Sequence, residues 1–173
     1  MTNKEFFQKC WKQEVVPTLT ALKALPEGEK LSYRPAEKNR SAKQLVDHFV
    51  SHVEDLIEAV ETGVLNHRVM ADYPTTENAT EVFEKESDKL MALLDATDDA
   101  TWDAKNIPML VMGNKFGEQP LGATCWMFLF DLIHHRGQLS TYYRPMGAAQ
   151  PAIYGPTAEM VEQMMAAQSA SAN

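Results

Sequence analysis

The stretch that decides the fold is LGATCWMFLFDLIHHRGQLSTYYRP, residues 121–145. From Cys125 to Ile133 it is apolar on nearly every side, which predicts a helix in the middle of a protein core. Asp131 interrupts this run, and a lone buried carboxylate is costly unless a cation or strong donors meet it. His135 follows one helical turn later, so the two side chains leave the same face of the helix. This spacing indicates half of a metal site.

The same pair of residues also has a purely structural interpretation. Asp131 would then pair with an arginine, for example Arg136 of another chain, and His135 would make ordinary hydrogen bonds. In favour of a metal, imidazole is a good ligand for zinc, nickel or iron, and a carboxylate adds a hard anionic oxygen. The spacing alone leaves both interpretations open.

Length and composition narrow the class of protein. A chain of 173 residues is expected to form one domain, here residues 1–168, with a disordered tail at 169–173. The net charge of −8 disfavours binding to nucleic acid. The longest apolar run, Trp126–Ile133, is far too short to span a membrane, and the N-terminal residues lack the apolar core of a signal peptide. Cys10 and Cys125 are interpreted as reduced thiols, because they lie far apart in the sequence. Reduced thiols predict a cytoplasmic protein.

Apolar residues recur at three- and four-residue steps in several segments, and the sequence shows no convincing long strand. The first segment contains Pro17, where a kink is expected, and Ser41 and Gly63 are suitable start and stop residues for the second. An all-α helix bundle is therefore the predicted fold class. The predicted long helices are residues 3–24, 41–62, 75–94 and the segment that begins at 121.

A long connection precedes the last long helix. Residues 95–120 read as irregular, apart from a short hairpin at 109–117 that would turn at Gly113 and Asn114. After Pro145 comes a segment rich in glycine and proline, followed by a short helix at about 157–167.

The other histidines are weaker candidates for metal binding. His48 and His52 lie one turn apart on the second helix, and metal sites in bundles draw ligands from facing helices. His52 is the one expected at a boundary between core and solvent, so it is a reserve ligand. His134 points about 100° away from His135 and is expected to play a supporting role. His67 falls in a predicted loop and is expected to be solvated.

Two segments resemble the DinB-like (DinB/YfiT) superfamily of metalloproteins. The first is HHRGQLSTYYRPMGAAQPAIYGP, residues 134–156, and the second is RPAEKNRSAKQLVDHFVSHVEDL, residues 34–56. Together with the helix count and length, the resemblance covers nearly the whole chain. It implies an up-and-down variant of the four-helix bundle, often dimeric, so a homodimer is expected.

The resemblance also implies a metal site. The family's ligand on the second helix maps onto His48, and the second of its paired histidines maps onto His135. The first of that pair falls on Asp131, so two nitrogens and one carboxylate replace three nitrogens. This change favours harder ions and leaves zinc, nickel, iron and manganese as candidates.

The wider superfamily includes metal-dependent thiol transferases and a thiol-dependent isomerase. The resemblance therefore implies a transferase or hydrolase acting on small molecules, with a low-molecular-weight thiol as one candidate substrate. A metal ion in such a site activates a water or thiol, and Tyr142 is a candidate to assist from the pocket wall. The alternative is a non-catalytic, stress-related binding or dimerisation module with a vestigial metal site, because Asp131 departs from the family pattern.

Overall fold

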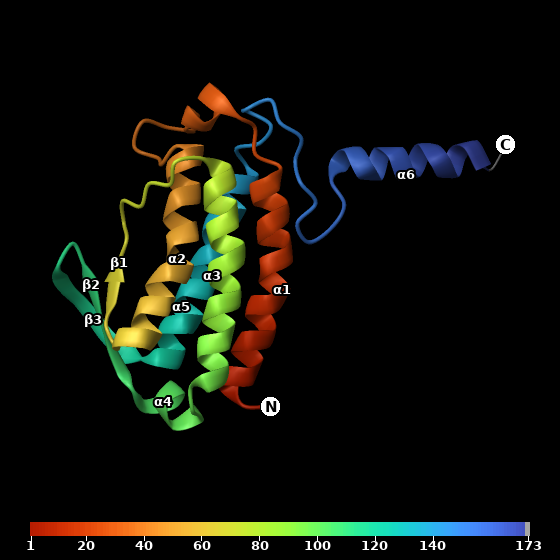
Figure 1. Cartoon of the computed structure of the whole chain (residues 1–173). Coiled ribbons are helices and arrows are strands. Elements are labelled where there is room, and N and C mark those ends of the chain that lie inside the picture. Colours follow the sequence, from red (N-terminus) through yellow and green to blue (C-terminus); the bar gives the residue numbers. More distant parts are fainter. Residues whose placement is uncertain (172–173) are drawn as a thin grey trace.

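A computed structural model describes residues 1–171 of the chain, which are mostly helical and include one small sheet (Figure 1). Four long helices lie side by side, with α2 packed against α3 and α5, and α1 packed against the same two helices. The long helices are α1 (Asn3–Lys23), α2 (Ala42–Thr62), α3 (Thr76–Ala96) and α5 (Leu121–Ser140). The shorter ones are the 3-10 helix η1 (Gly28–Ser32), α4 (Asp99–Ala104) and α6 (Ala158–Ser171).

Local signals in the sequence set the ends of the helices. At the start of α2, the side chain of Ser41 accepts from the backbone of Gln44, whose side chain accepts from the backbone of Ser41 in return. Gly63 ends the same helix with a φ of 77°, a conformation that glycine adopts without strain. Both predicted boundary residues of α2 are therefore confirmed. The predicted kink at Pro17 does not interrupt α1, which continues as one helix to Lys23.

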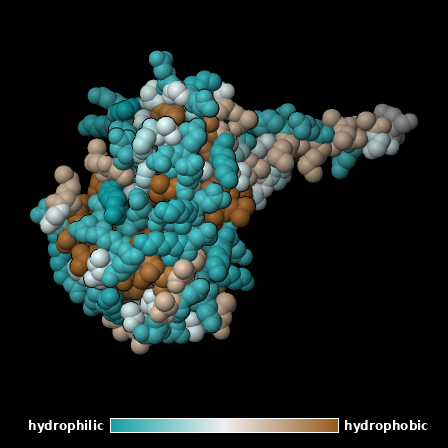
Figure 2. Space-filling model, in the orientation of Figure 1, coloured by the Kyte–Doolittle hydropathy of each residue, from teal (hydrophilic) through white to brown (hydrophobic). Residues whose placement is uncertain are grey.

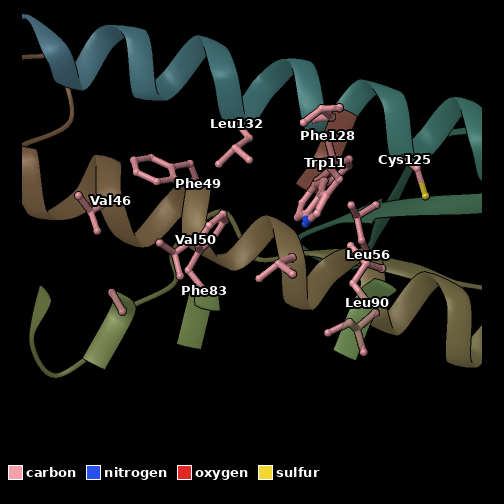
Figure 3. Packing of buried hydrophobic residues seen from close by; sticks show 14 of the residues in the cluster. Trp11, Val46, Phe49, Val50, Leu56, Phe83, Leu90, Cys125, Phe128 and Leu132 are labelled. Atoms are coloured by element: carbon pink, nitrogen blue, oxygen red, sulfur yellow. The ribbon is translucent and has the colours of Figure 1, made fainter. Parts of the chain in front are cut away.

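The core lies between the long helices. Figure 3 shows Phe49 of α2 between Leu132 of α5 and Phe83 of α3, and Leu56 farther along α2. These four side chains are at most 1% exposed, so α2 is covered by α3 and α5. Burial on this scale contributes about 1.5–3 kcal/mol for each large apolar side chain.

The prediction that α5 is buried on nearly every side is wrong. One face is packed, but Phe130 is 61% exposed and Trp126 is only partly covered. The physical reason is that α5 packs against α1 and α2, whereas the face that carries Phe130 lines an open cavity beside the sheet. Phe6 of α1 joins these two aromatic rings, with ring centroids 5.6 Å from Trp126.

A three-stranded sheet, β1-β2-β3, corrects the all-α prediction. The hairpin of β2 (Asn106–Val111) and β3 (Asn114–Pro120) was predicted, although it is longer than expected. It turns at Met112 and Gly113, where φ is 50° and 79°, one residue earlier than predicted, so that Asn114 begins β3. The strand β1 (Leu65–His67) was not predicted, and it pairs in parallel with β2. A three-residue strand has no periodicity to detect, and its partner lies far along the chain.

At the C-terminal end, α6 stands clear of the body of the molecule (Figures 1 and 2). It has no buried residue and extends to Ser171, beyond the predicted end at about 167. Of the predicted tail, residues 169–171 are helical, and residues 172 and 173 lie outside the described part of the chain. Within residues 1–171, no helix is both long and apolar enough to cross a membrane.

Candidate metal centre

Side chains from three elements meet beside the sheet, where α2 contacts both α5 and β1. Four of the five members are histidines, and the fifth is the carboxylate at the middle of α5. Their neighbouring ring centroids lie 4.8–6.0 Å apart. The members are His48 and His52 of α2, His67 of β1, and Asp131 and His135 of α5.

The structure brings the three predicted ligands together. One ligand atom from each of His48, Asp131 and His135 lies within 4.8 Å of the other two. Asp131 Oδ2 is 3.3 Å from His135 Nε2, and the rings of His48 and His135 are 4.8 Å apart between centroids. The one-turn spacing on α5 therefore places both side chains toward the same point, as expected.

Gln138 contacts the ring nitrogen of His135 that faces away from Asp131, and this contact determines which of the two nitrogens carries the proton. The amide oxygen of Gln138 lies 2.8 Å from His135 Nδ1, and its nitrogen lies 2.9 Å from His134 Nε2. Because the amide nitrogen can only donate, the amide oxygen accepts from His135 Nδ1–H. Neutral His135 then presents an Nε2 lone pair to a carboxylate oxygen. Two acceptors that face each other require a proton or a metal ion between them.

His52 reinforces this argument. Its side chain is fully buried, and neither ring nitrogen has a hydrogen-bond partner among the described residues. Its Nε2 lies 3.4 Å from Asp131 Oδ2, and Nδ1 of the buried His48 also has no partner. A buried polar group without a partner costs about 1–3 kcal/mol, so these orphaned nitrogens favour a bound cation. The boundary position expected for His52 is wrong, because α5 covers it.

His67 corrects another prediction, because it is not a solvated loop residue. Its side chain is only 16% exposed, and its Nδ1 lies 2.8 Å from Oδ2 of the buried Asp55. Arg68 pairs with the other oxygen of that carboxylate. With Nδ1–H donating to Asp55, the Nε2 atom of His67 is free, and a second three-histidine group, His48, His52 and His67, lies within metal-binding range. The pairing of β1 with β2 produces this placement, which the sequence pattern did not reveal.

Burial keeps the inner histidines neutral. Desolvation, with the nearby charge of Arg40, lowers the pKa of His48 to about 4, and desolvation lowers the pKa of His52 well below its usual value. Burial alone would raise the pKa of Asp131, but the hydrogen bond and charge of His135 outweigh it and hold that pKa at about 2. His48 and His52 are therefore neutral and Asp131 is a carboxylate, the protonation states that metal ligands need.

Asp131 is less buried than the apolar run predicted. Its side chain is 42% exposed, because its face of α5 opens to a cavity. Desolvation of Asp131 therefore favours a cation less than expected, and the close approach of the His52 and His135 nitrogens to its carboxylate favours a cation instead. Within residues 1–171, the donor set of imidazole nitrogens and one carboxylate fits a divalent ion.

Several other candidates have structural roles. Arg136 is 1% exposed and bonds Glu14 and Thr18 of α1, with Nη2 2.5 Å from Glu14 Oε2. It thus supports the packing of α5 against α1. The hydroxyl of Tyr142 donates to the backbone oxygen of Arg40, 3.3 Å away, and a role for Tyr142 in catalysis stays a prediction.

Neither cysteine belongs to the candidate centre. Cys10 and Cys125 are both free, which agrees with the prediction of reduced thiols. Burial raises the pKa of the Cys125 thiol, so this residue is a poor nucleophile.

The fold and the centre define a mostly helical protein with a candidate site for a divalent metal. The model of the DinB family matches residues 1–168, and the chain belongs to this family. A search of curated proteins finds no match.

Two solved structures share the fold. A DinB-like protein from Bacillus cereus is 20% identical with a TM-score of 0.67, over 87% of this chain and 97% of that one. A DinB-like protein from Bacillus subtilis is 19% identical with a TM-score of 0.64, over 87% of this chain and 99% of that one.

Proposed function

We propose that this protein is a metal-dependent enzyme that acts on small molecules, of the thiol transferase or hydrolase type. In this proposal His48, Asp131 and His135 hold one divalent ion. The observation that carries the proposal is the convergence of two imidazole nitrogens on Asp131 Oδ2, at 3.3 Å for His135 and 3.4 Å for His52, beside a His48 Nδ1 that has no partner among the described residues. A cation among these atoms would satisfy both the carboxylate and the buried imidazole nitrogens that have no other partner.

Individual residues of the site have different roles in this proposal. Gln138 fixes the tautomer and orientation of His135, as partners of ligating histidines commonly do. Asp131 contributes negative charge, and its partial exposure gives a small molecule access to the site. Three protein ligands leave coordination positions open, as in catalytic rather than structural sites. The ion itself would supply Lewis acidity, which lowers the pKa of a neighbouring water or thiol. Zinc, nickel, iron and manganese all suit this donor set.

The proposal extends to the architecture and the assembly. The pairwise packing of α1, α2, α3 and α5 supports an up-and-down four-helix bundle, with the long connection before α5. A homodimer is supported by the exposed aromatic side chains Phe6 and Phe130 on the outer faces of α1 and α5. The free cysteines support a cytoplasmic location.

Metal analysis of untagged protein tests the proposed ligands. Asp131→Ala and His135→Ala should each lose stoichiometric metal at neutral pH while the helical circular dichroism spectrum is unchanged. Asp103→Ala removes an exposed carboxylate of α4 outside the cluster and should keep the metal. If both ligand variants retain stoichiometric metal, or the metal-loaded wild type binds none, the proposed site is wrong.

An activity measurement separates the enzyme from the non-catalytic alternative. The metal-loaded chain should consume an electrophile in the presence of a low-molecular-weight thiol, or hydrolyse a small ester or amide, faster than Asp131→Ala does. Equal rates for both proteins across these substrates would favour a binding or dimerisation module with a vestigial site.

A further inference from the structure

A cavity of about 620 Å³ opens beside the candidate metal centre, between α5 and the sheet. Its volume lies in the range of sites that bind small molecules. Most of its wall is apolar, and its polar members, His67, Asp131 and His134, include two of the metal-binding cluster. The apolar wall consists of Met109, Val111, Phe116, Met127, Phe128 and Phe130.

The charge of the wall limits what can bind. No lysine or arginine is among the lining residues, and the one formally charged group is the carboxylate of Asp131. Away from the candidate metal, a ligand with several carboxylates would find no side-chain cation to pair with, and in the metal-free chain it would meet the like charge of Asp131. An anion that loses its water without gaining a partner binds poorly.

The exposure of the wall points to an apolar ligand. Phe116 of β3 is 75% exposed and Phe130 of α5 is 61% exposed, although both line the cavity. Phenylalanine and methionine side chains on two facing elements give a bound apolar group contacts on both sides, and covering them removes apolar surface from water.

We propose that this cavity binds the apolar, ring-sized part of an uncharged substrate, whose reacting group faces Asp131 and His67. The inference rests on the proposed function, because it names the substrate class of the same site. In a thiol transfer, the occupant would be the apolar electrophile. The polar, charged thiol would approach from outside the cavity, where it is not forced against the apolar wall.

The neutral fluorescent amine N-phenyl-1-naphthylamine is a suitable probe for the cavity. The full chain, both as purified and after treatment with EDTA, should bind the probe with increased fluorescence. Phe116→Ser should weaken binding at least fivefold, and this side chain is exposed enough to be replaced without harm to the core. Met112→Ser, at an 82% exposed position of the same hairpin outside the cavity wall, should bind the probe as the wild type does.

Competition in the EDTA-treated chain tests the charge preference. Uncharged 1-naphthalenemethanol should displace the probe, and anionic 1-naphthoate should require at least a tenfold higher concentration. The inference is overturned if the probe does not bind, if Met112→Ser weakens binding as much as Phe116→Ser, or if the two competitors are equally effective. Probe binding by the EDTA-treated chain does not require metal, so this result and the metal analysis can fail independently.

Discussion

At the residue scale, His48 couples the stability of the metal-free chain to pH. Its pKa is about 4 in the folded protein and 6.5 in an unfolded chain, so the unfolded state binds the proton more readily between these values. Stability is therefore fully present above pH 6.5 and is lost progressively as the pH falls toward 4. A shift of this size corresponds to roughly 3 kcal/mol, and His52 acts in the same direction.

Thermal unfolding of the EDTA-treated chain between pH 7.5 and 4 measures this effect. We expect Tm to fall by several degrees over the range, and His48→Gln to show a shallower dependence, because glutamine does not titrate. Asp131 does not contribute in this window, since its lowered pKa affects stability only below about pH 4. A Tm that stays constant from pH 7 to 4.5 would contradict the burial of neutral His48.

The sequence predicted some members of the candidate site and missed others. Asp131 and His135 were found because one-turn spacing on a helix is a local property that the sequence displays directly. His48 was assigned through the family resemblance, and the structure brings it to the same point. His67 was missed because its position depends on the pairing of β1 with β2, and no local pattern records such a pairing.

At the scale of the elements, predictions succeeded where a boundary depends on local chemistry. The capping box at Ser41 and the hairpin turn at Gly113 are examples, since neighbouring residues determine both. The burial of α5 was mispredicted for the opposite reason. An apolar sequence predicts a buried helix on average, but whether a neighbour covers the outer face is decided by the whole fold.

Gly122 lies where α5 begins against α4, and it permits the two helices to approach closely. A Cβ atom added there would lie 2.5 Å from Nε1 of Trp102, whose ring is 1% exposed. This indole also donates to Asn3 at 3.0 Å, so moving it would disturb a second contact. We expect Gly122→Ala to reduce the free energy of unfolding by about 1–3 kcal/mol and to lower Tm by several degrees.

Gly137 on the same helix provides the matched control for this substitution. A Cβ atom there meets no other atom within 4 Å, so Gly137→Ala should raise stability by about 0.5–1 kcal/mol through better helix propensity. The measurement is urea unfolding of both variants beside the wild type. Similar stabilities for the two variants would show that close packing against Trp102 does not determine the residue at position 122.

At the scale of the whole molecule, the long helices supply most of the rigid framework and the sheet adds one wall. The two Bacillus structures share this fold at only 19–20% identity, which fits a framework that depends on apolar periodicity more than on particular residues. The candidate centre lies where the helices and the sheet meet. Its histidines are largely buried, and its Asp131 borders an open apolar cavity. This position gives buried ligands and access for a small molecule at the same time.

The terminal helix α6 contributes no buried residue to the body of the molecule. Its described polar links include the exposed ion pair between Arg144 and Glu159, at 2.8 Å, and such pairs contribute about 0–1 kcal/mol. A chain that ends after Pro156 keeps Tyr154, which bonds Glu14 at 2.6 Å and holds the preceding segment against α1. We therefore expect this shortened chain to keep Tm within a few degrees and to bind metal as before.

Light scattering of the full and shortened chains completes the comparison. We expect both to be homodimers at micromolar concentration, because the exposed aromatic residues Phe6 and Phe130 remain in the shortened chain. A large loss of Tm on shortening would show that α6 packs against the body in solution. If the full chain is a dimer and the shortened chain a monomer, α6 and not the aromatic face forms the contact between copies, whereas two monomers would contradict the homodimer itself.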